Sequence, residues 1–187
     1  WVIAMPILIV LTVITALLTI FVSALGMSST LGYYIPHIWA KFWCFLMFVK
    51  VEIRGRENID KKTSYVFVAN HQGAYDIFVI FGYLNHVFKW MMKKSLEKIP
   101  FVGMACKVSK NIMVDRSSAS TIQKTMDSAM EILKDGISLV VFPEGSRTPD
   151  GKMKPFKRGA FMLATEFGLP IAPIKIDGSY KVMRKDT

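Results

Sequence analysis

Cysteine is scarce in this sequence, and its placement excludes several kinds of site. The two cysteines among 187 residues are Cys44, in an apolar run, and Cys106, which follows Met104 and Ala105. They have neither CxxC spacing nor the spacing of metal ligands, so we expect two packed free thiols. The sequence therefore predicts no metal site, and the free thiols are compatible with a cytosolic domain.

Charge is absent from the first 40 residues, which contain no Lys, Arg, Asp or Glu. The whole formal net charge of +10 therefore falls on the chain from Lys41 onward. A length of 187 residues is enough for one domain with a sizeable core. A basic domain favours anionic partners, which include nucleic acid, acidic lipid and phosphorylated small molecules, and charge alone does not choose among them.

The uncharged start predicts a membrane segment. Residues 1–25 would span ~38 Å as a helix, against a hydrocarbon core of ~30 Å. A signal peptide is the alternative, but no basic region precedes this stretch and it exceeds the usual apolar length. Because the sequence does not begin with methionine, that alternative stays open.

A second apolar stretch, residues 35–49, follows a turn at residues 26–30 and is too short to span comfortably. Trp39 and Trp43 are expected to anchor it at the membrane interface. We therefore predict a helical hairpin in residues 1–50 that anchors the chain to the bilayer; a buried hairpin in a soluble protein is the alternative. The basic residues that follow place the second domain, residues 51–187, on the cytoplasmic face of the membrane, which in a bacterium is the inner membrane. These residues are Lys41, Lys50, Arg54 and Arg56.

Beyond residue 50, short apolar runs alternate with helical patterns, which is typical of an α/β domain with a largely parallel sheet flanked by helices. The predicted strands are residues 65–69, 87–92, 111–114, 137–142 and 171–176. The clearest helix is residues 120–134, where Ile122, Met126, Met130 and Leu133 form one apolar stripe before Gly136. Another helix is predicted over residues 76–84.

His71 and Asp76 are the first candidate catalytic pair. In a continuous helix they would lie about 140° apart, so pairing requires His71 in a turn and Asp76 on the helix that follows. The turn residues 70–73 between a strand and a helix supply that break. A carboxylate on one ring nitrogen leaves the other free to take a proton, so the pair predicts a general base. The alternative is a helix-capping aspartate beside a structural histidine.

A second polar group is Phe142-Pro143-Glu144-Gly145-Ser146-Arg147, at the end of a predicted strand. Glu144 and Arg147 can brace this loop, Gly145 lets backbone N–H groups approach a ligand, and Arg147 offers a fork for phosphate. Two weaker motifs are Asp115-Arg116 at a strand end and the strand in residues 169–174. Its two prolines exclude ladder hydrogen bonds and mark an edge strand or a strand entry.

In this order the four motifs resemble those of the glycerolipid acyltransferase family, and most closely its lysophosphatidic acid acyltransferase branch. That family carries NHxxxxD, a strand ending in Asp-Arg, FPEG followed by Ser or Thr and Arg, and a VPIVPV-like strand. Lys94-Ser95-Leu96 with Pro100 and Gly103 is similar to a further family motif, and the resemblance covers residues 50–176. Two departures are Lys110, where the family has glycine, and Met113, where it has an aromatic. Family members continue beyond the last motif, so we expect the chain to be truncated at its C-terminus.

The resemblance implies acyl transfer from acyl-CoA or acyl-carrier protein to the sn-2 hydroxyl of lysophosphatidic acid in phospholipid biosynthesis, without a further cofactor. His71 would remove the hydroxyl proton and Asp76 would orient the ring, so no acyl-enzyme is needed. Ser146 lacks the flanking glycines of a GxSxG elbow and is expected at the substrate site rather than as a nucleophile. The residues assigned to the substrate, above all to its phosphate, are Arg116, Arg147, Glu144, Gly145, Ser146 and Lys94, with Lys157 and Arg158 as auxiliaries.

Other functions stay open on the sequence alone. A membrane-tethered module that binds anionic lipid or nucleic acid without chemistry leaves the acid-base pair unexplained, and the resemblance speaks against nucleic acid as a partner. A thioesterase would use His71 with water as the acceptor. Within acyltransferases, glycerol-3-phosphate, another lysophospholipid or an amino-lipid are alternative acceptors.

Overall fold

The computed structural model describes residues 2–26, 29–115, 118–134 and 137–183. The helices are α1 (Ala4–Ala24), α2 (Ser29–Leu46), α3 (Tyr75–Tyr83), α4 (Val102–Val108), α5 (Ala119–Lys134), α6 (Gly159–Glu166) and α7 (Ser179–Val182). The 3-10 helices are η1 (Arg56–Asn58) and η2 (Lys94–Lys98). The strands are β1 (Val66–Ala69), β2 (Phe88–Lys93), β3 (Ile112–Val114), β4 (Ser138–Val141) and β5 (Ile171–Ile174).

The five strands form one sheet in the order β3-β2-β4-β1-β5, and every pair in it is parallel. All five predicted strands are confirmed, with ends that shift by at most two residues. Strands β1 and β4 are buried along their whole length, as expected for a parallel sheet covered on both faces. Strand β5 lies at an edge, which explains why Pro173 is tolerated inside it.

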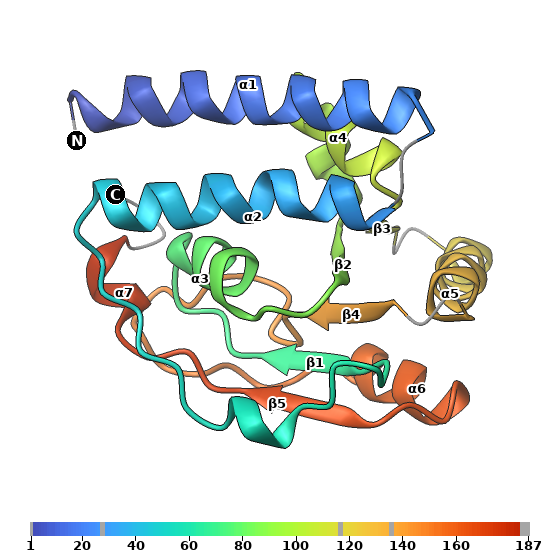
Figure 1. The fold of residues 1–187 in the computed structure, drawn as a ribbon. Coiled ribbons are helices and arrows are strands. Elements are labelled where there is room, and N and C mark those ends of the chain that lie inside the picture. The colour runs from blue at the N-terminus through green and yellow to red at the C-terminus, as the bar shows by residue number, and fades with distance from the viewer. Residues whose placement is uncertain (1, 27–28, 116–117, 135–136, 184–187) are drawn as a thin grey trace.

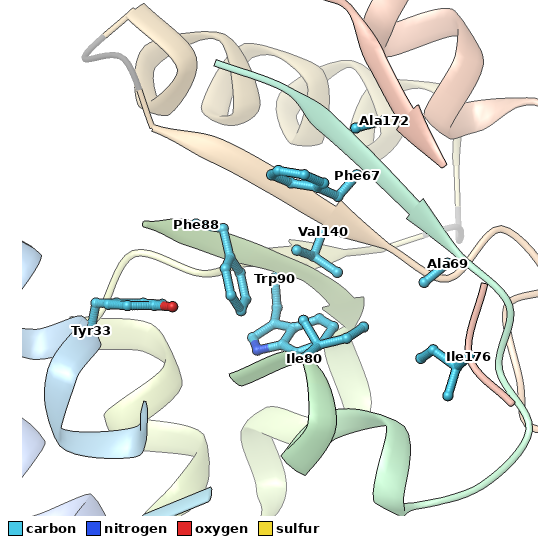
Figure 2. Packing of buried hydrophobic residues seen from close by; sticks show 9 residues of the cluster. All are labelled: Tyr33, Phe67, Ala69, Ile80, Phe88, Trp90, Val140, Ala172 and Ile176. Carbon is cyan, nitrogen blue, oxygen red and sulfur yellow. The ribbon is translucent and has the colours of Figure 1, made fainter. Parts of the chain in front are cut away.

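Helices α2 and α3 cover one face of the sheet, and Figure 2 shows the cluster of aromatic and aliphatic side chains that packs between these helices and the strands. Phe88 and Trp90 of β2 meet edge to face, with ring centroids 5.2 Å apart, and Tyr33 of α2 packs against Phe88 at 5.4 Å. The other face is covered by α5 and α6, and its core comprises small and branched side chains. The predicted helices at residues 76–84 and 120–134 are confirmed as α3 and α5.

The N-terminal hairpin is present as two antiparallel helices side by side (Figure 1). Helix α1 has 21 residues and is long and apolar enough to cross a membrane, a property that a signal sequence near the N-terminus shares. Its large apolar side chains are mostly exposed, so the alternative of a hairpin buried in a soluble core does not fit α1.

Helix α2 differs from its prediction in two ways. It begins at Ser29, inside the residues assigned to the turn, and it packs closely on α3, where a Cβ at Gly82 would lie 3.2 Å from the backbone nitrogen of Lys41. The prediction that Trp43 anchors the chain at a membrane interface was wrong, because this side chain is 1% exposed and packs against Phe78. Apolar partners from α3 explain the burial, and a single helix pattern gives no sign of them.

Candidate active site

The polar motifs come together because the sheet is parallel. His71 follows β1, residues 142–147 follow β4, Lys94 follows β2 and Asp115 follows β3. The carboxyl ends of parallel strands share one edge of the sheet, where ligands of open α/β folds bind. Four segments that are distant in the sequence therefore meet at one site.

His71 and Asp76 form the expected pair, since His71 Nδ1–H donates to Asp76 Oδ2 at 2.7 Å. The same oxygen accepts the backbone N–H groups of Gln72 at 2.6 Å and Gly73 at 3.0 Å. Asp76 is completely buried. These contacts fix the tautomer in which Nε2 is the proton acceptor.

The turn between His71 and Asp76 depends on Gly73. A Cβ at this position would lie 2.5 Å from the backbone oxygen of Met183, which follows α7. The N–H groups that Asp76 accepts precede α3, whose N-cap is Ala74. Asp76 therefore closes the histidine turn instead of capping the helix, and the capping alternative is not supported.

Three neighbours hold His71 itself in place. Its backbone N–H donates to Glu144 Oε1 at 2.7 Å, and its carbonyl accepts the N–H of Thr148 at 3.0 Å. Its ring stacks on Phe142 with centroids 3.9 Å apart and planes 11° apart, and Phe142 in turn stacks on Trp90 at 5.4 Å. These contacts join the turn after β1 to the loop after β4 and hold the imidazole between them.

Glu144 braces the loop after β4, as the sequence predicts. Its side chain is 4% exposed, and its second carboxylate oxygen accepts the Lys154 backbone N–H at 2.8 Å. With His71 and Lys154 as donors, both oxygens are occupied by backbone groups. Direct contact between Glu144 and a substrate stays a prediction, and the geometry favours an indirect role through His71.

Gly145 and Lys157 lie close together across the loop. Gly145 has φ +73, in the left-handed region, and a Cβ there would lie 2.9 Å from Lys157 Nζ. Lys94 Nζ donates to Asp115 Oδ2 at 2.8 Å, and its side chain remains 53% exposed. Lys94 and Lys157 therefore both lie at this edge of the sheet and line the same cavity as His71.

A cavity of about 800 Å³ joins this polar edge to an apolar interior. His71, Lys94, Gly145, Ser146 and Lys157 all contribute to its lining. Its remaining walls come mainly from α1, α2, β2, η2 and α4, and include threonine, leucine, isoleucine, tryptophan and methionine side chains. Apolar walls beside charged side chains fit a ligand with a polar head and a hydrocarbon tail.

Some predicted site residues are not placed in this lining. Arg147 is half-buried, and its carbonyl accepts Lys154 Nζ at 3.2 Å, while Arg158 is exposed at the start of α6. Neither is among the residues that line the cavity, and Arg116 lies outside the described residues. The roles of these three arginines in phosphate binding stay predictions.

Sequence reasoning missed Lys154 and the ring of Phe142. Lys154 Nζ donates to Ser146 Oγ as well as to the Arg147 carbonyl, so it ties the loop after β4 to the segment that follows. Its separation from Ser146 in the sequence left no local signal. Among the described residues, no group of three or more His, Cys, Asp or Glu side chains is arranged to hold a metal ion.

The family model described as Acyltransferase matches residues 50–177. Similar proteins include the 1-acyl-sn-glycerol-3-phosphate acyltransferase BAT2, chloroplastic, of Brassica napus, 34% identical over 79% of this chain and 44% of the relative. The 1-acyl-sn-glycerol-3-phosphate acyltransferase of Pseudomonas aeruginosa is 36% identical over 73% of this chain and 54% of the relative. The chain thus spans about half the length of the curated relatives it matches.

A solved structure is also similar. The 1-acyl-sn-glycerophosphate (LPA) acyltransferase PlsC from Thermotoga maritima superposes with a TM-score of 0.74 at 30% identity, covering 91% of this chain and 69% of that one. Because it covers 91% of the chain, the match extends beyond residues 50–177 and includes part of the N-terminal residues 1–49. The paired histidine and aspartate, the parallel sheet and these similarities lead to one conclusion: the chain belongs to the Acyltransferase family.

Proposed function

We propose that this protein transfers a fatty acyl group from an acyl thioester to the free sn-2 hydroxyl of lysophosphatidic acid, giving phosphatidic acid. The observation that carries the proposal is the His71–Asp76 pair at a cavity lined by lysines and by many apolar side chains. Relatives named as 1-acyl-sn-glycerol-3-phosphate acyltransferases support the choice of acceptor. The donor is acyl-CoA or acyl-carrier protein.

The proposed reaction is a single displacement at the thioester carbonyl. His71 Nε2 takes the proton of the acceptor hydroxyl as its oxygen forms a bond to the carbonyl carbon. The carbon–sulfur bond then breaks, and the imidazolium returns the proton to the leaving thiolate. Asp76, which holds Nδ1–H at 2.7 Å, stabilises the imidazolium between these two steps.

The two ends of the cavity suit the two parts of the substrates. Lys94 and Lys157, at the edge that holds His71, supply positive charge for the acceptor phosphate, and Arg147 and Arg116 are further candidates. The apolar walls from α1, α2 and α4 suit an acyl chain, whose burial contributes about 0.8 kcal/mol per methylene. The lining thus offers charged side chains to the head of the substrate and apolar side chains to its tail.

Membrane residence is part of the proposal. Helix α1 directs Thr12, Thr15 and Thr19 toward the cavity, while large side chains such as Leu18 and Phe21 are about half exposed or more. That arrangement is the reverse of a surface helix in a soluble protein, which directs its apolar stripe inward. With α1 in the bilayer, the basic residues after α2 favour the cytoplasmic face for the catalytic domain.

The test is a product profile. Purified protein is offered lysophosphatidic acid, glycerol-3-phosphate or other lysophospholipids, each with acyl-CoA and with acyl-carrier protein, and the products are identified by mass spectrometry. We expect phosphatidic acid, and we expect His71→Ala to lower its rate by at least about 10²-fold while folding is retained. Release of free fatty acid without phosphatidic acid would instead identify water as the acceptor and a thioesterase as the function.

A further inference from the structure

A second apolar surface lies at the junction of η2 and α4, in residues 94–104, which we call the η2–α4 knuckle. It exposes four large apolar side chains. They are Leu96, Ile99, Phe101 and Met104, which are 38%, 43%, 49% and 54% exposed. These four side chains lie within nine positions; Leu96 and Ile99 also line the cavity, and Phe101 and Met104 do not.

The backbone of the knuckle is strained at Phe101. This residue has φ 61 and ψ −50, and the Val102 N–H donates to the Pro100 carbonyl at 2.6 Å. These values describe a γ-turn of the rare positive-φ type, which is unfavourable for a bulky residue. Because the ring of Phe101 remains half exposed, packing in the core does not account for the strain.

The knuckle is also folded tightly onto η2. A Cβ at Gly103 would lie 2.1 Å from the carbonyl oxygen of Glu97, so only glycine allows α4 to begin this close to η2. Leu96, Ile99 and Val102 line the cavity, whereas Phe101 and Met104 are not part of its lining. The knuckle is therefore a wall of the cavity with an apolar outer side.

Positive charge surrounds this surface. Exposed lysines that the site does not use lie within it and on both sides of it in the sequence, and Glu97 is the acidic residue within it. These lysines are Lys93, Lys98 and Lys107. Apolar tips between ammonium groups fit a surface whose phosphates lie above a hydrocarbon layer.

The knuckle lies next to the helix that is apolar enough to enter a membrane. Helix α4 packs against α1 (Figure 1), whose exposed side chains include Ile14, Leu17 and Leu18. The two apolar surfaces are thus neighbours, and the cavity runs between them because both helices line it.

We propose that the η2–α4 knuckle is a second membrane contact, which enters the interfacial region of the bilayer that holds α1. Phe101 and Met104 lie among the acyl chains near the headgroups, and Lys98 and Lys107 contact lipid phosphates. The contact turns the cavity toward the hydrocarbon layer, so that an acyl chain passes between membrane and active site without crossing water. This inference rests on the proposed function for the identity of the substrate, but the contact itself does not.

The first experiment measures depth. Met104→Cys is labelled with an environment-sensitive fluorophore in a Cys106→Ser chain, since Cys44 is fully buried. Met162→Cys on α6 is the matched control, because Met162 is a methionine of similar exposure, 58%, on a helix at the opposite face of the sheet. On vesicles with anionic lipid we expect a blue shift and quenching by brominated acyl chains at position 104 but not at 162. Equal behaviour of the two labels would overturn the proposal.

The second experiment measures use of membrane-bound substrate. We expect Met104→Asp to lower the rate on long-chain acceptor in vesicles by roughly tenfold and to leave the rate on a short-chain, water-soluble acceptor within about twofold, with Met162→Asp unaffected on both. The double variant Lys98→Glu, Lys107→Glu should show the same selective loss on anionic vesicles. Equal losses on both acceptors would contradict a membrane role.

The two experiments also distinguish failure of the proposed function from failure of the membrane contact. If wild-type protein turned over neither acceptor, the proposed function would fail, while the depth measurement would still report on the knuckle. If acyl-carrier protein shielded the label at Met104 in the absence of vesicles and vesicles did not shift it, the lysine-ringed surface would belong to an acidic protein partner, and the membrane contact would be refuted.

Discussion

Asp76→Asn is the most direct test of the proposed catalytic pair, because it removes the negative charge of the side chain and keeps its shape. Asp76 Oδ2 accepts three N–H groups, from His71, Gln72 and Gly73. In the variant we expect the amide oxygen to accept these three hydrogen bonds, because an NH₂ group in that position would place its own N–H donors against three N–H donors. The amide nitrogen then replaces Oδ1, which is buried and has no hydrogen-bond partner within the described residues.

The expected loss of kcat follows from the missing negative charge, which in the wild type stabilises the imidazolium of His71. With a 2.7 Å contact between Nδ1 and Oδ2, the centres of the two charges lie about 4 Å apart, which corresponds to about 4 kcal/mol at an effective dielectric constant of about 20. A factor of ten in rate corresponds to about 1.4 kcal/mol, so we expect kcat to fall roughly 10³-fold. The KM for the acceptor should change little, because Asp76 is fully buried and does not line the cavity.

The assay is a steady-state measurement of phosphatidic acid formation beside a thermal unfolding curve of the same preparation. A folded variant with a large loss confined to kcat supports the general-base role of His71. A folded variant whose kcat lay within a few-fold of the wild type would refute it and reduce Asp76 to a structural residue.

Four further predictions follow. Gly73→Ala should destabilise the fold by about 1–3 kcal/mol in thermal or chemical unfolding, because its Cβ would lie 2.5 Å from the Met183 oxygen; a neutral result would show that the contact relaxes. Lys110→Gly should raise the free energy of unfolding by up to about 1 kcal/mol, since Lys110 has φ 55, and a loss would mean that its side chain stabilises the fold. Burial lowers the pKa of Lys89 from 10.5 to about 8, so between these pH values the unfolded chain binds more protons than the folded one, and the free energy of unfolding should rise with pH. Lys89→Met should raise the free energy of unfolding at pH 7 by at most about 3 kcal/mol and should abolish that rise, as measured by denaturation curves at several pH values. Arg147→Lys should raise the KM for the phosphate-bearing acceptor more than for the thioester donor, and the opposite split in steady-state kinetics would assign the arginine to the donor.

The strands and the catalytic turn were predictable because their causes are local. A strand buried on both faces of a parallel sheet is mostly apolar, as residues 66–69 and 139–141 are, so it is visible without knowledge of its partners. The pairing of His71 with Asp76 also has a local cause, since a turn over Gly73 brings them together.

The rest of the site depends on strand order, which no local pattern encodes. Because β4 lies between β1 and β2, the loop after β4 reaches His71, and Glu144 accepts its N–H from 73 positions away. The stacking of His71 on Phe142 has the same origin. The motif FPEG was therefore recognisable in the sequence, but its use of Glu144 as a brace under the imidazole was not.

Helix α2 links the apolar start of the chain to the catalytic sheet. Tyr33 belongs to the aromatic core in Figure 2, and Trp43 is buried against α3, whose first turn carries Asp76. Helix α1 shows the opposite distribution, with Ala16 and Thr19 buried and the large apolar side chains outward. Removal of both helices would expose the core that supports Asp76, whereas removal of α1 alone would take one wall from the cavity and leave α2 on the sheet. Helix α1 is thus the part of the hairpin that is long, apolar and exposed enough to enter a bilayer, whereas α2 packs on the helix that carries Asp76.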